Sequence, residues 1–214
     1  MEVTQKLEGK PPCEVYLIRH TQVDTQWKGR CYGQLDVELS REGMAAIASI
    51  VDTFSEKCIS TIMHSGLRRA ERLAHAIASN HPNAMLAVDA RLAERNYGDW
   101  EGTTWDSIYV ADPEFHNLIH KPREYRPPRG ETTLEMQSRV MDWWNTLTEA
   151  PVTVVVSHSG PIASLCGSLL NLDAIEWEPW MLATGQCIKI IRSTPPSVMR
   201  MASGVNYSHS APLK

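Results

Sequence analysis

The chain alternates between short apolar runs and longer segments in which apolar residues recur at helical spacing. The apolar runs, rich in branched residues, occupy 13–18, 58–65, 84–89, 151–158 and 186–193. The helical segments cover 40–57, 66–80, 131–150 and 160–171. This alternation predicts a three-layer α/β/α sandwich with a mostly parallel central sheet, and the unbroken apolar strands predict helices on both of its faces.

Within that sheet, we expect 14–18, 59–63 and 152–156 to be parallel central strands and 186–193 to be an edge strand. Residues 103–130 interrupt the pattern with four prolines and the basic residues Lys121, Arg123, Arg126 and Arg129. We interpret 1–192 as a single domain in which 103–130 is an insertion over one edge of the sheet. The tail 193–214 is rich in Ser and Pro, and we expect it to be poorly ordered.

Composition and charge narrow the class of protein. Hydrophobic residues make up 43% of the 214 residues, which suits a folded core, and the net charge of -4 provides no general attraction to nucleic acid or to a membrane surface. No apolar run is long enough to span a bilayer, and the N-terminus lacks the apolar segment of a signal peptide. The five cysteines are odd in number and form no CxxC pair. We therefore predict a cytoplasmic protein.

Candidate chemistry gathers where the apolar runs end. Three of the runs end on basic side chains: Arg19 and His20, then His64 with Arg68 and Arg69 just beyond it, then His158. In open parallel sheets ligands bind outside the carboxyl ends of the strands, and helices that begin there offer free N–H groups. Arg68 and Arg69 are neighbours on a helix, so only one of them can face the site. The sequence predicts a local pocket for a dianion such as phosphate.

Four segments that lie in order along residues 15–165 point to one family. The segments LIRHT, SGLRRA, LAERNYGDWEG and VVVSHSG resemble the motifs RHG, SxLxRA, LxExxxGxWEG and SHGG of the histidine phosphatase superfamily, the phosphoglycerate-mutase-like enzymes. The stretch 29–43 is also similar to the segment that follows RHG in that family. The resemblance implies phosphoryl transfer through a phosphohistidine, with no cofactor and no metal.

The resemblance also implies roles for individual residues. His20 is expected to be the nucleophile, while Arg19, Arg69 and His158 hold the phosphoryl oxygens. Glu94 is expected to donate a proton to the leaving oxygen. Taken without the motif, Glu94 is better explained as a surface partner of Arg91 or Arg95.

Three positions depart from the family pattern: Thr21 and Ser159 each replace a glycine, and Gln26 stands where many members have a phosphate-contacting Asn. We expect Gln26 and Ser159 to contact the phosphate. Several aromatic residues lie in the segments around the expected site: Tyr32, Tyr97, Trp100, Trp105 and Tyr125. Tyr32 and Tyr97 are candidates for contacting the substrate, and core packing is the alternative for the whole group.

We therefore expect a metal-independent phosphomonoesterase that acts on a small-molecule phosphate ester. The stretch 31–40, CYGQLDVELS, is similar to the alpha-ribazole phosphatase branch, which implies alpha-ribazole 5'-phosphate as a substrate. A phosphoglycerate-mutase-type phosphotransferase and a non-catalytic phosphate-binding member remain alternatives. No HxH or HExxH spacing suggests a metal site, and a helical pair of His116 and His120 is not expected among the surrounding prolines.

The substrate's leaving group is expected to reach toward 103–130, since in this family the insertion covers the site. The basic residues at 121–129 would then favour substrates with extra negative charge, unless they form a solvated loop. Nothing in the sequence decides the oligomeric state, and a homodimer is among the open alternatives.

Overall fold

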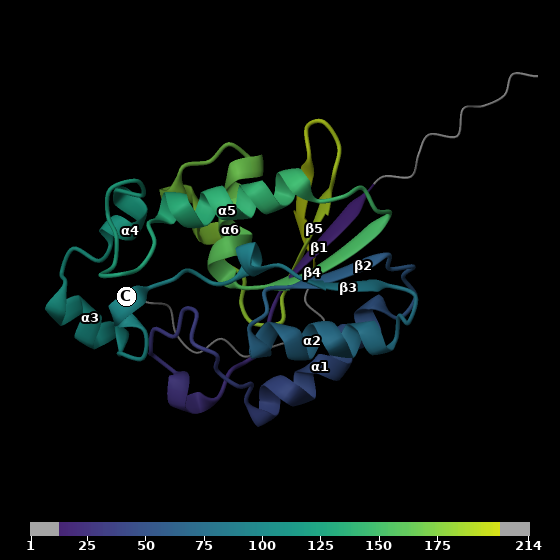
Figure 1. Ribbon diagram of the computed structural model, residues 1–214, viewed down its shortest axis with the longest axis horizontal. Coiled ribbons are helices and arrows are strands. Elements are labelled where there is room, and N and C mark those ends of the chain that lie inside the picture. Colours follow the sequence, from purple (N-terminus) through teal and green to yellow (C-terminus); the bar gives the residue numbers. More distant parts are fainter. Residues whose placement is uncertain (1–12, 202–214) are drawn as a thin grey trace, which may run out of the picture.

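A six-stranded sheet lies between two layers of helices in the computed structural model, which describes residues 13–201 (Figure 1). The strands are β1 (Glu14–Arg19), β2 (Thr61–His64), β3 (Met85–Val88), β4 (Val152–Ser157), β5 (Cys187–Ile191) and β6 (Ser197–Arg200). Their order is β3-β2-β4-β1-β5-β6. The first four strands in that order are parallel, while β5 is antiparallel to β1 and β6 to β5. The predicted α/β class and the parallel pairing of the three central strands are confirmed.

The helices divide between the two faces of the sheet. They are α1 (Arg41–Phe54), α2 (Arg68–Ser79), α3 (Trp105–Ala111), α4 (Asn117–His120), α5 (Thr133–Thr146) and α6 (Ser159–Leu169), with 3-10 turns η1 (Thr25–Trp27), η2 (Ala90–Leu92), η3 (Gly98–Trp100) and η4 (Ala174–Trp180). Helices α1 and α2 cover one face, and α5 and α6 cover the other (Figure 1). The four longer helices lie where the apolar spacing predicted them.

The core follows from the alternation of side chains along buried strands. In β1, Tyr16 and Ile18 pack into the cluster beneath α1 and α2, whereas Val15 and Leu17 pack into the cluster beneath α5 and α6. All four are at most 1% exposed. Because both faces of the strand are covered, every position must be apolar, which explains the continuous apolar runs in the sequence.

The two strands that carry the candidate histidines are adjacent. β1 pairs with β4 in a register that places Arg19 opposite Ser157, so His20 and His158 follow at the same edge of the sheet. The chain leaves β1 toward α1 on one face and leaves β4 into α6 on the other (Figure 1). Such a point of divergence opens a crevice at the carboxyl ends of the two strands.

Two expectations about the C-terminal part were wrong. β5 is not an edge strand, because β6 pairs with its outer side over Ile188–Ile191. β6 lies within the tail that was expected to be poorly ordered, and it takes the edge position instead. The remainder of that prediction, 202–214, falls outside the described residues, as do 1–12 of the predicted domain.

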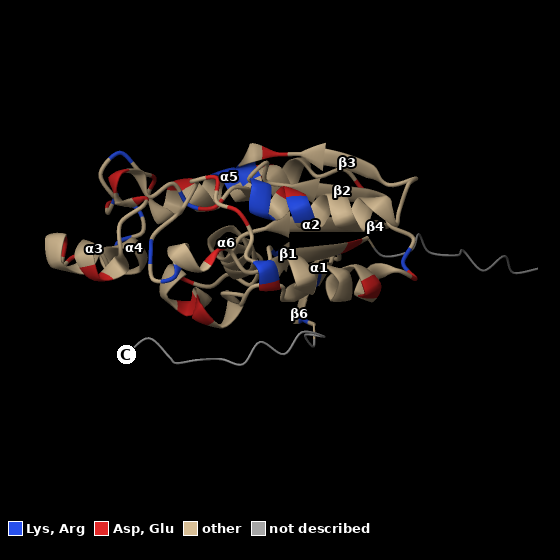
Figure 2. Ribbon diagram, turned by 90° about the horizontal axis from the view of Figure 1, so that it is seen from below, with Lys and Arg blue, Asp and Glu red and all other residues tan. Residues whose placement is uncertain are grey.

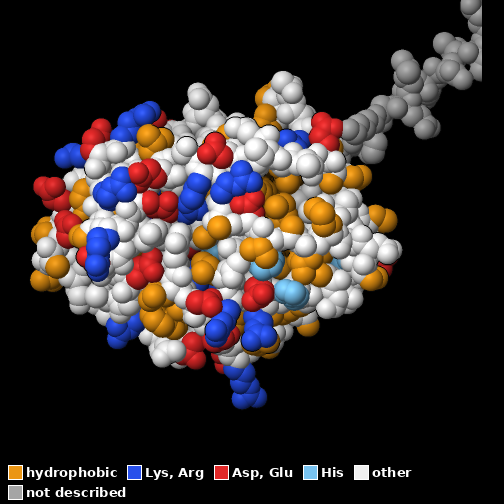
Figure 3. Space-filling model, viewed as in Figure 1, with side chains coloured by type: hydrophobic (Ala, Val, Ile, Leu, Met, Phe, Trp, Pro, Cys, Tyr) orange, Lys and Arg blue, Asp and Glu red, His pale blue; other side chains and the backbone are white. Residues whose placement is uncertain are grey.

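The insertion at 103–130 contains α3 and α4, which project at one end of the molecule in both ribbon views (Figures 1 and 2). The expectation against a helical pair of His116 and His120 was wrong, since His116 caps the start of α4, α4 ends at His120, and the two rings are 5.7 Å apart. Basic and acidic side chains intermingle on the surface (Figure 3). Across the described residues, none of the helices has the length and apolar character needed to cross a bilayer.

Candidate active site

The two candidate histidines lie side by side at the crevice between β1 and β4. Their ring centroids are 5.2 Å apart, and His20 and His158 are 1% and 0% exposed. The backbone N–H of His20 donates to the carbonyl oxygen of Ser157, 3.1 Å away, which ties the end of β1 to the end of β4. The sheet thus holds both imidazoles in fixed positions.

A hydrogen bond defines which nitrogen of His20 carries the proton. Nδ1 lies 2.7 Å from the carbonyl oxygen of Thr21. Because a carbonyl can only accept, Nδ1 must be protonated, and the lone pair of the neutral ring is on Nε2. Burial, together with the positive charges of Arg19 and Arg69, holds the pKa of His20 well below its usual value. The ring is therefore neutral at physiological pH, as a nucleophile requires.

The second histidine is held by a hydroxyl. Nε2 of His158 lies 2.8 Å from Oγ of Ser65, and that oxygen also accepts from the backbone N–H of Leu67 at 3.3 Å. Burial and the charge of Arg69 hold the pKa of His158 well below its usual value. Ser65 lies within the SGLRRA motif, but its contact with His158 could not be seen in the sequence.

Of the two adjacent arginines, only Arg69 belongs to the site. Arg69 is fully buried and donates to the carbonyl oxygens of Leu35 and Gly33, at 2.7 and 2.5 Å. Its Cζ lies 5.2 Å from the ring centroid of Tyr32. Arg68 instead forms ion pairs at the surface. The helix separates the two side chains by about 100°, which produces this division.

Several buried polar atoms at this site have no hydrogen-bond partner in the described part of the chain. Of the six such side-chain atoms, four belong to it: Arg19 Nε, Thr21 Oγ1, Arg69 Nε and His158 Nδ1. The Nε–H groups of the two arginines can only donate, and both guanidinium groups are positively charged. Arg19 also donates through Nη1 to the carbonyl oxygen of Leu182, 2.6 Å away. The site therefore offers charged donors that an anion would satisfy.

Glu94 is held close to this group of residues. Its Oε1 accepts from the backbone N–H of Arg95 at 2.9 Å, and its carbonyl oxygen accepts from Gln34 at 2.9 Å and from Arg139 at 3.1 Å. A Cβ atom at Gly160 would lie only 2.6 Å from Oε1 of Glu94. The single glycine of the SHSG segment therefore leaves the space that the carboxyl group occupies.

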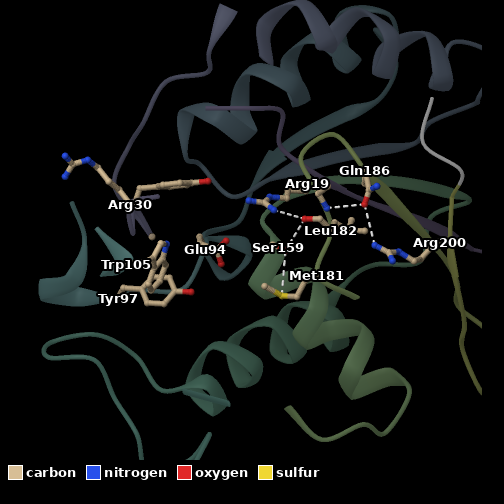
Figure 4. A pocket seen from close by; sticks show the side chains of 13 residues that line it. Arg19, Arg30, Glu94, Tyr97, Trp105, Ser159, Met181, Leu182, Gln186 and Arg200 are labelled. Atoms are coloured by element: carbon tan, nitrogen blue, oxygen red, sulfur yellow. Dashed lines mark hydrogen bonds between the residues drawn. The ribbon is translucent and has the colours of Figure 1, made fainter. Parts of the chain in front are cut away.

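Arg19 and Glu94 also line a pocket of about 850 Å³, whereas the more deeply buried Arg69 and the two histidines are not among its lining residues. Its walls include several of the residues singled out in the sequence: Arg19, Tyr32, Glu94, Tyr97, Trp105 and Ser159. The Ser159 hydroxyl donates to the carbonyl oxygen of Leu182 at 3.2 Å. Figure 4 shows Glu94, Tyr97 and Trp105 on one side of Arg19, and Gln186 and Arg200 on the other. Tyr97 and Trp105 form an edge-to-face pair with ring centroids 5.5 Å apart.

The structure does not bring every candidate to the pocket. Gln26 is exposed in η1 and lines a separate hollow with Trp27 and Arg30, so the expected contact with the phosphate is not supported. Its backbone N–H donates to the side chain of Asp24, which caps η1 and turns this segment outward. Trp100 belongs to an apolar cluster with Tyr125 packed against it, as the core-packing alternative holds.

The basic residues at 121–129 also lie elsewhere. Arg126 pairs with Glu135, and Arg129 pairs with Asp99. None of the four basic residues of this segment is among the residues that line the pocket in the described structure. A residue that the sequence analysis missed, Arg200, lines it instead, and it comes from the tail that was expected to lack order.

Comparisons with known proteins agree with this geometry. The family model of the histidine phosphatase superfamily (branch 1) matches residues 15–197. A glucosyl-3-phosphoglycerate phosphatase of Mycolicibacterium vanbaalenii is 28% identical over 172 residues, which cover 75% of this chain and 76% of that protein. A protein of Escherichia fergusonii named probable phosphoglycerate mutase is 30% identical over 180 residues, 81% of each chain.

Solved structures show the same fold. A mycobacterial glucosyl-3-phosphoglycerate phosphatase superimposes with a TM-score of 0.72 at 26% identity, over 84% of this chain and 90% of the other. An alpha-ribazole phosphatase from Shigella flexneri superimposes with a TM-score of 0.77 at 20% identity, over 91% of this chain and all of the other. Four motifs in order, their convergence at one crevice and the family match lead to one conclusion: the chain belongs to the histidine phosphatase superfamily.

Proposed function

We propose that this protein hydrolyses small-molecule phosphate monoesters through a phosphohistidine formed on His20. The observation that carries the proposal is the hydrogen bond from Nδ1 of His20 to Thr21, which leaves a nucleophilic lone pair on Nε2. This lone pair lies in a buried site beside two guanidinium groups. An anion-binding module has no need of a neutral imidazole with this tautomer, so the arrangement favours catalysis over binding alone.

In the first step, Nε2 of His20 attacks phosphorus, a P–N bond forms and the P–O bond to the alcohol breaks. Glu94 transfers its proton to the departing oxygen, so that the alcohol leaves neutral. Arg19, Arg69 and His158 neutralise the charge on the three remaining phosphoryl oxygens. In the second step, a water molecule gives a proton to the Glu94 carboxylate and attacks phosphorus, which releases phosphate and restores His20.

The size of the pocket favours a substrate with a substantial leaving group, because about 850 Å³ greatly exceeds the volume of a phosphate. Alpha-ribazole 5'-phosphate is the first specific substrate to test, on the strength of the stretch 31–40. The names of the relatives add phosphoglycerate esters as a second group. The proposed location is the cytoplasm, which the five free cysteines support.

The test of the reaction combines a label with three variants. A ³²P-labelled monoester quenched in alkali should leave label on His20, and His20→Ala should lower kcat by roughly a thousandfold or more. Glu94→Gln should slow the hydrolysis of an alkyl phosphate far more than that of nitrophenyl phosphate, whose leaving group needs no proton. His75→Ala is the matched control, because His75 is exposed on α2.

Activity should persist in EDTA, since the proposed mechanism uses no metal. A loss of activity in EDTA, or full activity of His20→Ala, would exclude the proposed mechanism. Measuring free phosphate beside isomerised product separates hydrolysis from mutase activity.

A further inference from the structure

Arg200 lies at the end of the pocket away from the aromatic pair Tyr97 and Trp105 (Figure 4). We propose that Arg200, held in position by Gln186, forms a second anion-binding subsite, which selects phosphate monoesters whose alcohol part carries its own anionic group. This inference rests on the proposed function and names the class of substrate. Figure 4 shows Arg200 on the other side of Arg19 from Glu94.

The first observation is the state of the Arg200 side chain. It is exposed, and no carboxylate lies within ion-pair distance of it in the described part of the chain. Other arginines do have such partners: Arg68, Arg91, Arg126, Arg129 and Arg139. Arg200 therefore faces the pocket with an uncompensated charge.

The second observation is the orientation of Gln186. Its Oε1 accepts from the backbone N–H of Ala183 at 3.1 Å and lies 3.4 Å from Nη2 of Arg200. The amide oxygen therefore holds the Arg200 guanidinium at this end of the pocket. The guanidinium keeps further N–H donors, which can bind one carboxylate or phosphate.

Charge in the rest of the pocket favours the same ligand. Among its described lining residues, Glu94 is the only acidic side chain, whereas three arginines line it: Arg19, Arg30 and Arg200. The guanidinium of Arg30 donates to the carbonyl oxygen of Gly102 and points away from the other labelled side chains (Figure 4). Arg200 is therefore the arginine placed to contact a leaving group.

The experiment compares substrates that differ only in charge at the far end. Phosphate monoesters of ω-hydroxy carboxylic acids of increasing length are each paired with the monoester of the diol of the same length, and with the α,ω-bisphosphate. At the length that reaches Arg200, kcat/KM should be higher for the acid than for the diol. Comparison of the acid with the bisphosphate identifies which anion the subsite prefers.

Arg200→Gln should lower the acid-to-diol ratio of kcat/KM about tenfold, the lower end for a charged hydrogen bond at an exposed site. Arg200→Lys should retain part of the preference, because lysine keeps the positive charge but lacks the paired N–H donors of the guanidinium. Arg72→Gln is the matched control, since Arg72 is exposed on α2 and does not line the pocket. Equal ratios in the wild type and in Arg200→Gln overturn the subsite.

Binding measurements separate this inference from the proposed function. Calorimetry in a His20→Ala background gives the Kd of each ester without turnover, and Arg200→Gln should remove the preference for the acid there too. If no ester is hydrolysed by the wild type, the proposed reaction is wrong, and the Kd comparison still decides whether the subsite exists.

Discussion

At the scale of single residues, the site places a neutral imidazole between positive charges. The pKa of His20 is lowered first by burial and then by Arg19 and Arg69. In the proposed reaction the same two guanidinium groups bind the phosphate, so one arrangement serves both to keep the proposed nucleophile unprotonated and to bind its target. Glu94 is the only acidic side chain among the described residues that line the pocket. In the described part of the chain it forms no ion pair with Arg19 or Arg69.

Gly160→Ala tests whether the proposed proton transfer depends on the exact position of the Glu94 carboxyl group. The new Cβ would lie 2.6 Å from Oε1 of Glu94, so the carboxyl group must move. Because this group is the end of a flexible side chain, we expect Tm to change by only a few degrees. The hydrolysis of an alkyl phosphate should fall at least tenfold, and that of nitrophenyl phosphate much less. Ser164→Ala, in the same helix, provides a control for general disturbance of α6. Equal losses with both esters would contradict the role of Gly160 in positioning Glu94.

At the scale of elements, two strands and two helices each contribute one part of the site. β1 and β4 deliver the histidines, α2 delivers Arg69, and α5 holds the Glu94 backbone through Arg139. Arg139 also pairs with Glu131, just before α5 begins. The stability of α5 is therefore linked to the position of the proposed acid.

The start of α5 is a capping box, and its removal has a defined cost. The side chain of Thr132 accepts from the backbone N–H of Glu135, while the Glu135 carboxylate accepts from the backbone N–H of Thr132. Thr132→Ala should lower the free energy of unfolding by about 1 kcal/mol in urea titrations. Thr53→Ala, on the exposed side of α1, should change it by less than about 0.5 kcal/mol. The same small effect for both variants would show that the capping box contributes little.

The elements that could be predicted are those with a long periodic signal. Helices α1, α2, α5 and α6 and the three central strands follow from apolar spacing, and the motif match selected Arg69 rather than Arg68. β6 could not be predicted, because its sequence SVMR is mostly exposed and lies in no apolar run, and it forms by backbone pairing with β5. The outward turn of Gln26 depends on the Asp24 cap, and the role of Arg200 depends on β6, so both required the three-dimensional structure.

At the scale of the whole molecule, the buried histidines link stability to pH. The pKa values of His20 and His158 are both lowered from the ordinary value of 6.5. The unfolded chain therefore binds two protons below pH 6.5 that the folded chain does not, and stability must fall as the pH falls. Each group contributes a slope of about 1.4 kcal/mol per pH unit at pH values between its folded and its unfolded pKa.

Urea unfolding in phosphate-free buffers between pH 7.5 and 5.0 measures this slope. His158→Gln should reduce it by the contribution of one proton, whatever its effect on stability at pH 7.5. Thr53→Ala, which removes no titratable group, should leave the slope unchanged. An unaltered slope in His158→Gln would mean that His158 is protonated in the folded protein.

The position of β6 also bears on how such enzymes diversify. Arg200 lies on the outermost strand, whereas the residues proposed to hold the phosphate come from the centre of the sheet and from α2. Mutations in 192–201 can alter which alcohol is accepted without touching the residues that cleave its ester. Relatives can then diverge in substrate preference through substitutions in one terminal strand. Directed evolution confined to those ten positions should yield variants with new leaving-group preferences and an intact nucleophile.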